Sequence, residues 1–281
     1  MKPGLAFVIA HFHSEGRLAS DLLNLIQSLS QLTRRIVFVS TGLSAESAEK
    51  LRPFAQVIVR ENIGYDFWSY KVGIQLLGDL TGIDRLVIFN SSFITLSATA
   101  LCAPFIGPVD QPCLHGLTRC DFGRPHLQSF WVAFEHRDLI RSSQFERWWH
   151  DMTPVSERLD VIDRYEMGMS AYFSSAGMPI KAAFEPKPDE DVIAICRMMA
   201  SRWDRVEQWV DQSDGAAKLR VEQARRLNPT HFLWDALLSR HGILKIELLK
   251  SNPFDIGMKG LNRLCEHQPA VKALIDEALA N

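Results

Sequence analysis

No stretch of the 281-residue chain approaches the roughly 18 uninterrupted apolar residues that a membrane-spanning helix needs. No basic segment leads into an apolar core near the first residue, so no secretory signal is expected. The five cysteines form no CxxC pair, which argues against a disulfide framework or a zinc site and favours reduced thiols in the cytoplasm. A formal net charge of -2 gives no reason to expect nucleic acid as a partner. No GxGxxG follows the first apolar run, which leaves a dinucleotide-dependent oxidoreductase with little support.

Apolar residues occur in two alternating patterns over the first 95 residues. Short apolar runs suited to buried strands are followed by segments in which apolar residues recur at helical spacing. Three such alternations predict an α/β fold with a doubly wound, mostly parallel sheet and right-handed crossovers. The expected strands are residues 5–10, 36–39, 56–60, 85–89, 129–134 and 180–184, and the expected helices are residues 18–32, 45–51, 67–80, 138–150 and 161–175.

The character of the sequence changes beyond Pro186. We therefore expect a sheet domain over residues 1–186 and a helical C-terminal extension over residues 187–281 that packs on it. Segment 215–227 is basic and predicts a solvated helix face, with peripheral contact to a membrane as the alternative. Helical spacing occurs at residues 192–211, 215–227, 232–241 and 271–279, and the basic residues are Lys218, Arg220, Arg225 and Arg226.

Each of the first four expected strands ends in a polar turn. Because the carboxyl ends of parallel strands meet at one edge of a sheet, we expect a ligand-binding crevice there. The third turn combines Asn62, Gly64 and Asp66, which supply hydrogen-bonding groups and a permissive backbone. The alternative is an ordinary strand-to-helix connection in which Asp66 caps the helix. The four turns are residues 11–15, 40–42, 62–66 and 90–92.

Several polar and aromatic motifs follow one another along the chain in a distinctive order. They are Ala10-His11-Phe12, Glu61 to Phe67, Asn90-Ser91-Ser92, His126 to Phe130, Phe145, Trp148-Trp149, Tyr165-Glu166, Asn228 to His231 and Leu248 to Pro253. In this order they resemble the inverting nucleotide-sugar glycosyltransferases of the GT-A fold. More specifically, nearly the whole chain resembles the rhamnan synthesis protein F family of bacterial polysaccharide rhamnosyltransferases.

The resemblance implies roles for particular residues. Glu166 falls where a catalytic base leads a helix that a glycine, here Gly177, closes eleven positions later. The alternative for Glu166 is a solvated helix carboxylate, and that for Trp131 is a place in the core. The implied donor-binding residues are His11, Asn62, Gly64, Tyr65, Asp66, Asn90, Ser91 and Ser92, and the implied acceptor- or diphosphate-binding residues are His126, Gln128 and Trp131.

One departure from the family pattern concerns a metal ion. The triplet after the fourth strand more often reads Asn-Asp-Ser in that family, whereas Ser91 takes the acidic position here. Mg²⁺ and Mn²⁺ favour carboxylate oxygens, so no metal site is assigned, and Asp66 is the carboxylate that remains nearby. Without a metal, the diphosphate needs helix N-termini or cationic side chains. The cationic candidates are Arg60, Lys71, Arg119 and His126.

The resemblance thus implies transfer of a deoxysugar, L-rhamnose from dTDP-L-rhamnose, onto a growing glycan or lipid-linked glycan. Glu166 would deprotonate the acceptor hydroxyl in a single inverting displacement. No cofactor is assigned beyond a divalent cation, and the expected location is cytoplasmic, at or near the inner face of the membrane. The competing hypothesis is a non-catalytic nucleotide-sugar- or glycan-binding protein on a degenerate transferase scaffold, and Ser91 is the residue that favours it.

Overall fold

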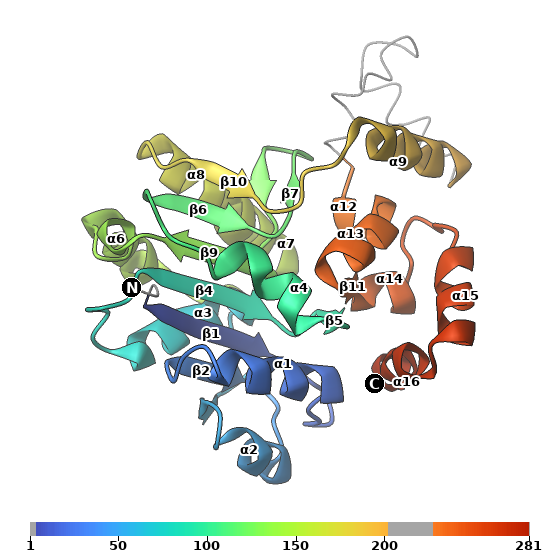
Figure 1. Cartoon of the computed structure of the whole chain (residues 1–281). Coiled ribbons are helices and arrows are strands. Elements are labelled where there is room, and N and C mark those ends of the chain that lie inside the picture. The colour runs from blue at the N-terminus through green and yellow to red at the C-terminus, as the bar shows by residue number, and fades with distance from the viewer. Residues whose placement is uncertain (1–3, 202–226, 281) are drawn as a thin grey trace.

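A seven-stranded sheet forms the centre of the computed structural model, which describes residues 4–201 and 227–280 (Figure 1). Its strands are β1 (Leu5–His11), β2 (Ile36–Ser40), β3 (Gln56–Val59), β4 (Arg85–Asn90), β6 (Cys113–Gly116), β9 (Trp131–Glu135) and β10 (Ile180–Ala182). They lie in the order β10-β6-β9-β4-β1-β2-β3. Only β9 runs against its neighbours in this sheet, pairing antiparallel with both β4 and β6. The predicted α/β class with a mostly parallel sheet is confirmed.

Helices cover both faces of this sheet. Alternation along β1 directs Phe7 and Ile9 into one hydrophobic cluster and Ala6 and Val8 into the other, as the two-residue period of a strand requires. The first cluster includes residues of α1 (Ser20–Ser30), α2 (Ala45–Leu51), α4 (Ala98–Cys102) and the 3₁₀ turn η1 (Ala103–Phe105). The second includes residues of α3 (Tyr65–Leu77), α5 (Arg137–Ile140), α6 (Ser143–Asp151), α7 (Arg158–Val161) and α8 (Gly168–Ser175).

Two predicted helices differ in detail from the structure. The helix expected over residues 138–150 is divided into α5 and α6, because the Ser142 hydroxyl accepts a hydrogen bond from the Phe145 amide (3.1 Å) and starts a new helix. The helix expected over residues 161–175 is a continuous run of α7, the π-helical turn η2 (Ile162–Met167) and α8. Gly177 follows it with a left-handed φ of 83°, as its predicted role at the helix end requires.

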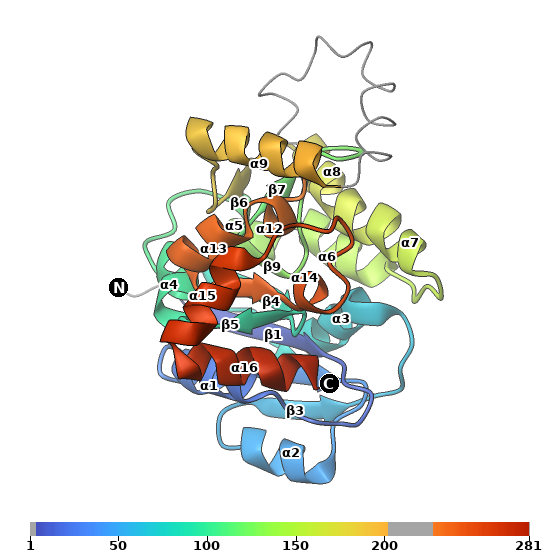
Figure 2. The ribbon, with the colours of Figure 1, turned by 90° about the vertical axis from the view of Figure 1, so that its right-hand side faces the viewer.

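The C-terminal segment packs across the carboxyl ends of β1 and β4 (Figures 1 and 2). It contains α9 (Pro188–Ala200), α12 (Pro229–Phe232), α13 (Trp234–His241), β11 (Ile243–Lys245), α14 (Ile246–Lys250), α15 (Lys259–His267) and α16 (Pro269–Leu279). The extension is mainly helical, but β11 was not predicted and pairs antiparallel with β5 (Phe93–Thr95), directly after β4. Part of the predicted helix 192–211, the part beyond Ser201, lies outside the described residues. The basic segment 215–227, for which a membrane contact was the alternative, lies outside them except for its last residue.

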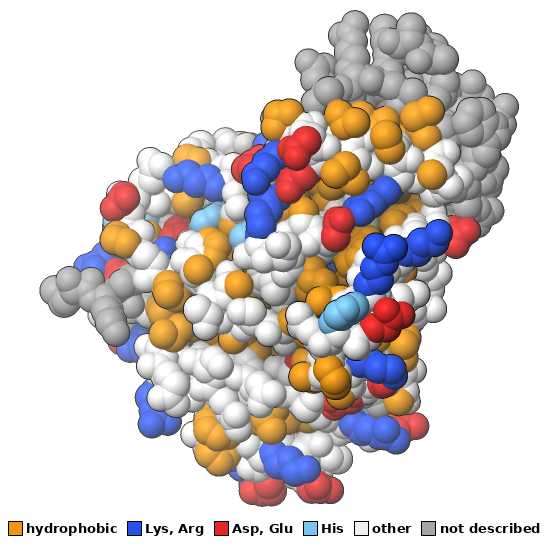
Figure 3. Space-filling model, turned by 45° about the vertical axis from the view of Figure 1, so that its right-hand side comes forward, with side chains coloured by type: hydrophobic (Ala, Val, Ile, Leu, Met, Phe, Trp, Pro, Cys, Tyr) orange, Lys and Arg blue, Asp and Glu red, His pale blue; other side chains and the backbone are white. Residues whose placement is uncertain are grey.

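Charged side chains of both signs are interspersed on the face shown in Figure 3, in keeping with a net charge of -2. Over residues 4–201 and 227–280, no helix has both the length and the apolar character required to cross a membrane.

Candidate active site

A cleft of about 650 Å³ opens where the carboxyl ends of β1 and β4 meet the C-terminal segment. Both parts of the chain contribute polar side chains to its lining. The sheet side provides His11, Asp66, Asn90 and Glu166, and the C-terminal segment provides Thr230 and Lys245. The position agrees with the crevice that the polar strand-end turns predicted.

A hydrogen-bonded chain connects three residues that were predicted to bind a donor. The Asn90 amide nitrogen donates to the Asp66 carboxylate (2.7 Å), while its amide oxygen accepts from the Ser92 hydroxyl (2.5 Å) and backbone amide (3.2 Å). Burial raises the pKa of Asp66, against the opposing effects of Asn90 and Lys245. Asp66 therefore acts as a partner of Asn90 inside the cleft, and the helix begins after Gly64 with no side-chain cap.

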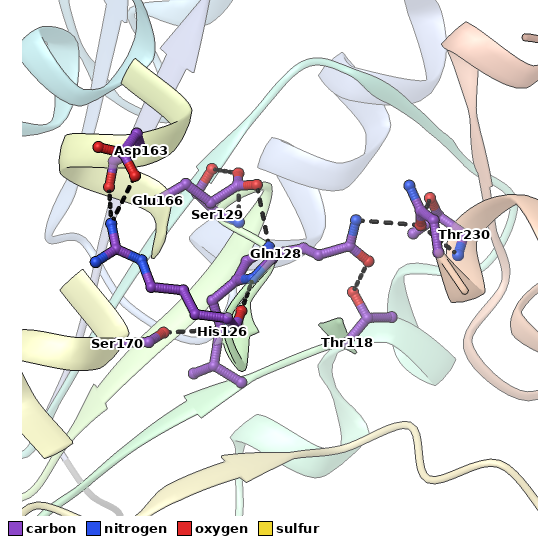
Figure 4. A network of polar contacts seen from close by, with 11 residues as sticks. Thr118, His126, Gln128, Ser129, Asp163, Glu166, Ser170 and Thr230 are labelled. Carbon is purple, nitrogen blue, oxygen red and sulfur yellow. Dashed lines mark hydrogen bonds and ion pairs between the residues drawn. The ribbon is translucent and has the colours of Figure 1, made fainter. Parts of the chain in front are cut away.

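Glu166 projects from η2 toward the segment that precedes β9 (Figure 4). Its Oε2 accepts hydrogen bonds from both the amide (3.1 Å) and the hydroxyl of Ser129, and its Oε1 lies 3.6 Å from Nε2 of His126. The Glu166 side chain is 23% exposed, and it also lines the cleft. The predicted base is thus held in a fixed orientation with access to a ligand.

Glu166 and His126 each favour the charged form of the other. His126, in the short strand β8 (His126–Leu127), has its Nδ1 2.8 Å from the Arg124 carbonyl, while its Nε2 faces the carboxylate. Acceptors at both ring nitrogens favour the doubly protonated imidazolium. Burial alone would lower the pKa of His126 and raise that of Glu166, but their mutual interaction, with the Ser129 hydrogen bonds, reverses both shifts. Glu166 is therefore ionised at neutral pH.

Gln128 connects the sheet side of the cleft to the C-terminal segment. Its amide oxygen accepts from the Thr118 hydroxyl (2.9 Å), as Figure 4 shows. Its amide nitrogen donates to the Asn228 side chain (3.2 Å). Asn228 also caps α12 by accepting from Thr230. Gln128 lines the cleft, and these bonds fix how the two parts of the wall meet.

The sequence profile of the rhamnan synthesis protein F family matches residues 36–109 and 110–237, which is most of the chain. The chain belongs to this family. The virulence protein VirA of Vibrio anguillarum is 28% identical over 236 residues, covering 78% of this chain and 69% of that protein. The uncharacterized protein y4gN of Sinorhizobium fredii is 22% identical over 204 residues, and the match spans 66% of this chain and about half (49%) of y4gN.

Solved structures give more distant similarities to this rhamnan synthesis protein F family member. The glycosyltransferase GlyE of Streptococcus pneumoniae has a TM-score of 0.45 at 12% identity, covering 98% of this chain and 63% of that one. A cytidylyltransferase from Leptospira borgpetersenii has a TM-score of 0.39 at 9% identity, covering 70% and 87%. Function is therefore inferred from the site and from the family.

Four residues with implied ligand contacts lie outside the cleft lining. Asn62 is exposed in the turn before α3. Gly64 has a structural role, because its φ is 69° and a Cβ there would lie 2.6 Å from Cβ of Trp68. Trp131 is 0% exposed and stacks 4.6 Å from the ring of Phe89, so burial in the core prevents a direct ligand contact.

His126 is the fourth of these residues, and it contacts Glu166 instead of lining the cleft. The other residues of the predicted set line the cleft: His11, Tyr65, Asp66, Asn90, Ser91, Ser92, Gln128 and Glu166.

The cations of the cleft differ from those expected for a diphosphate. Arg60 donates to backbone carbonyls of its own turn, Lys71 donates to the carbonyls of His150 and Met152, and Arg119 pairs with Asp121. The lining cations are instead Arg158, Lys245 and Lys250. Residues 243–249 are apolar except for Lys245 and Glu247. Charged residues within such a run are uncommon, and this was the available sequence signal for Lys245.

The donor set at the Asn90–Ser92 turn does not fit Mg²⁺ or Mn²⁺. The cleft lining includes five carboxylates, those of Asp21, Asp66, Glu166, Glu247 and Glu277. At the Asn90–Ser92 turn the hydrogen-bonded carboxylate is that of Asp66, and it already accepts the Asn90 amide. Ser91 supplies a hydroxyl where a carboxylate would be needed, and the Ser92 hydroxyl accepts from the Lys245 ammonium (2.5 Å), a cation that would repel a metal ion. Among the described residues, no three or more His, Cys, Asp or Glu side chains are arranged to hold a metal.

Proposed function

We propose that this protein is a glycosyltransferase that moves L-rhamnose from dTDP-L-rhamnose onto a growing bacterial surface polysaccharide by inverting single displacement. The observation that carries the proposal is the ionised Glu166 carboxylate, fixed by Ser129 and His126 at the edge of the strand-end cleft. Membership of the rhamnan synthesis protein F family supports a glycosyltransferase in general and a rhamnose donor in particular.

In this proposal, the chain's own groups orient both substrates. His11 lies at the end of β1 with its Nδ1 2.9 Å from the Ser40 hydroxyl, and burial, assisted by His13, lowers its pKa to about 4. It therefore meets the donor as a neutral hydrogen-bonding group. Tyr65, Asp66 and the Asn90–Ser92 turn provide the other donor contacts, and Gln128 lies on the wall beside the acceptor.

The chemical step transfers one proton and exchanges one bond. Glu166 accepts the proton of the acceptor hydroxyl as that oxygen bonds to the anomeric carbon. The bond from the anomeric carbon to the diphosphate oxygen breaks, and its electron pair leaves with dTDP. The acceptor is a glycan or lipid-linked glycan, and we place the reaction in the cytoplasm at the inner face of the membrane.

The proposal is tested by incubating the protein with dTDP-L-rhamnose and candidate rhamnose-containing acceptors, with dTDP-D-glucose as the matched control donor. We expect a rhamnosylated product whose anomeric configuration, measured by NMR, is inverted relative to the donor. Retained configuration would contradict the single displacement. Binding of dTDP-L-rhamnose without turnover of any acceptor would favour the competing hypothesis, a non-catalytic binding protein on a transferase scaffold.

Replacing His126 by asparagine is expected to move the acid limb of kcat/KM to higher pH by about one unit or more. The wild-type pKa of Glu166 is lowered, so the rate falls only where acid protonates that carboxylate. Without the imidazolium, burial dominates and raises this pKa, so activity is lost at a higher pH. The exposed His150 on α6 provides the control variant His150→Asn. An unchanged acid limb in His126→Asn would remove His126 from its positioning role.

A further inference from the structure

Lys245 places an ammonium group at the Asn90–Ser92 turn, directly after β4. Its Nζ donates to the Ser92 hydroxyl (2.5 Å) and lies 4.5 Å from the centre of the Phe130 ring. An ammonium has three N–H donors, and Ser92 takes one of them. Within residues 4–201 and 227–280 the other two donors have no hydrogen-bond acceptor, so they are available to a ligand in the cleft that Lys245 lines.

The hydrogen bonds around Lys245 form a directed chain. Lys245 donates to Ser92, Ser92 donates to the amide oxygen of Asn90, and the Asn90 amide nitrogen donates to Asp66. Each donor in this chain has an acceptor, so the lone pair of Ser92 is oriented toward a cation. The Asn90–Ser92 turn therefore holds a positive charge through an oxygen ligand, and the charge is that of Lys245.

Several charged groups surround this ammonium. Burial lowers the pKa of Lys245 to about 8, while Glu166 of η2, Glu247 of α14 and Asp66 of α3 oppose the shift and Arg158 of α7 adds to it. His231 of α12 also interacts with Lys245, but burial lowers the pKa of His231 to about 4, so this ring is neutral. Lys245 is thus cationic at neutral pH, partly desolvated and close to the candidate base.

We propose that the ammonium group of Lys245 takes the place of a divalent cation and binds the diphosphate of the donor, so that transfer is independent of metal. This inference rests on the proposed function. As the bond between the anomeric carbon and the diphosphate oxygen breaks, negative charge grows on that oxygen. A preorganised cation that is itself largely buried stabilises this charge more strongly than a cation in bulk water would. The acceptor proton passes to Glu166, and Lys245 keeps its own proton throughout.

The test measures binding of inorganic pyrophosphate and of dTDP by calorimetry, because neither probe depends on the identity of the sugar or acceptor. For the wild-type chain we expect the same Kd in EDTA as in magnesium chloride. Lys245→Met removes the charge at similar length and should weaken both probes by about 10- to 100-fold, the loss expected for a charge-assisted contact. Added magnesium should not restore binding.

Two further variants separate a loss of charge from a loss of structure. Lys245→Arg keeps a cation and should retain most of the affinity, whereas Lys181→Gln removes an exposed lysine of β10 and should bind as the wild type does. Affinity for dTDP should fall in the wild type as pH rises through about 8 and stay level in Lys245→Arg. Wild-type binding that EDTA abolishes, or equal binding by Lys245→Met, would overturn the inference.

The outcomes also separate this inference from the proposed function. Lys245-dependent binding of pyrophosphate without transfer of rhamnose would leave the anion site standing and refute the rhamnosyltransferase. Rhamnose transfer that requires magnesium would support the rhamnosyltransferase and refute the replacement of the metal by Lys245. Failure of the wild type to bind either probe would refute the anion site.

Discussion

Replacing Glu166 with glutamine is expected to reduce kcat by about 10²- to 10⁴-fold, the contribution typical of a positioned general base. Glutamine has nearly the same shape and its amide oxygen can still accept the Ser129 hydrogen bonds, so the fold and the donor affinity should change little. The amide has no useful basicity, so only the proton transfer is lost. The measurement is the initial rate of rhamnose transfer together with the Kd for dTDP.

The matched control for Glu166→Gln is Asp163→Asn. Asp163 lies on the same π-helical turn, is exposed and pairs with Arg124, so its replacement should leave kcat unchanged. Equal rates for Glu166→Gln and the wild type would exclude Glu166 as the base while leaving the transferase itself in place. A drop in thermal stability parallel to the drop in rate would instead indicate a structural role.

Replacing Glu135 with glutamine is expected to lower the free energy of unfolding by about 3–5 kcal/mol, the usual cost of breaking a buried ion pair. Arg85 and Glu135 lie opposite each other on β4 and β9, 2.6 Å apart, with side chains 2% and 6% exposed. The second Glu135 oxygen lies 3.0 Å from Nδ1 of His115. Removing the carboxylate charge leaves the buried guanidinium uncompensated, and urea denaturation followed by circular dichroism measures the loss.

Two comparisons make the Glu135 result specific. Glu46→Gln removes an exposed pair with Lys50 and should leave the denaturation midpoint unchanged. The double variant Arg85→Met with Glu135→Leu should recover much of the loss, because no unpaired charge remains buried. A midpoint for Glu135→Gln close to that of the wild type would show that the Arg85 hydrogen bonds to the Phe105 and Gly107 carbonyls suffice.

The parallel half of the fold could be predicted because its signals are local. Alternation of apolar runs and helical spacing located β1 to β4 to within a residue or two at either end, and Gly177 closed a helix where expected. The antiparallel placement of β9 has no such signal. Its five residues are buried on both faces, so periodicity alone gives neither direction nor neighbour.

Some residues of the candidate site could be identified from the sequence, and others could not. Glu166, His11 and the Asn90–Ser92 turn were identified from motif order and do line the cleft. Trp131 takes the alternative place in the core, against Phe89. The sequence did not decide between the two, because an aromatic residue beside polar motifs looks the same whether it stacks on a sugar or on another ring. The side of the sheet on which Trp131 lies is set by the pairing of β9 with β4 and β6.

The sequence by itself determined the class of fold, the edge of the sheet that carries the polar turns, and the family, because each depends on neighbouring residues or on their order. Only the tertiary structure decided which charges meet in the cleft. Lys245 stands 153 positions from Ser92, and β11 brings it to the end of β4 by pairing with β5. His126 and Glu166 are likewise joined by packing. Electrostatic interactions depend on distance in space and on burial, and neither can be derived from separation along the chain.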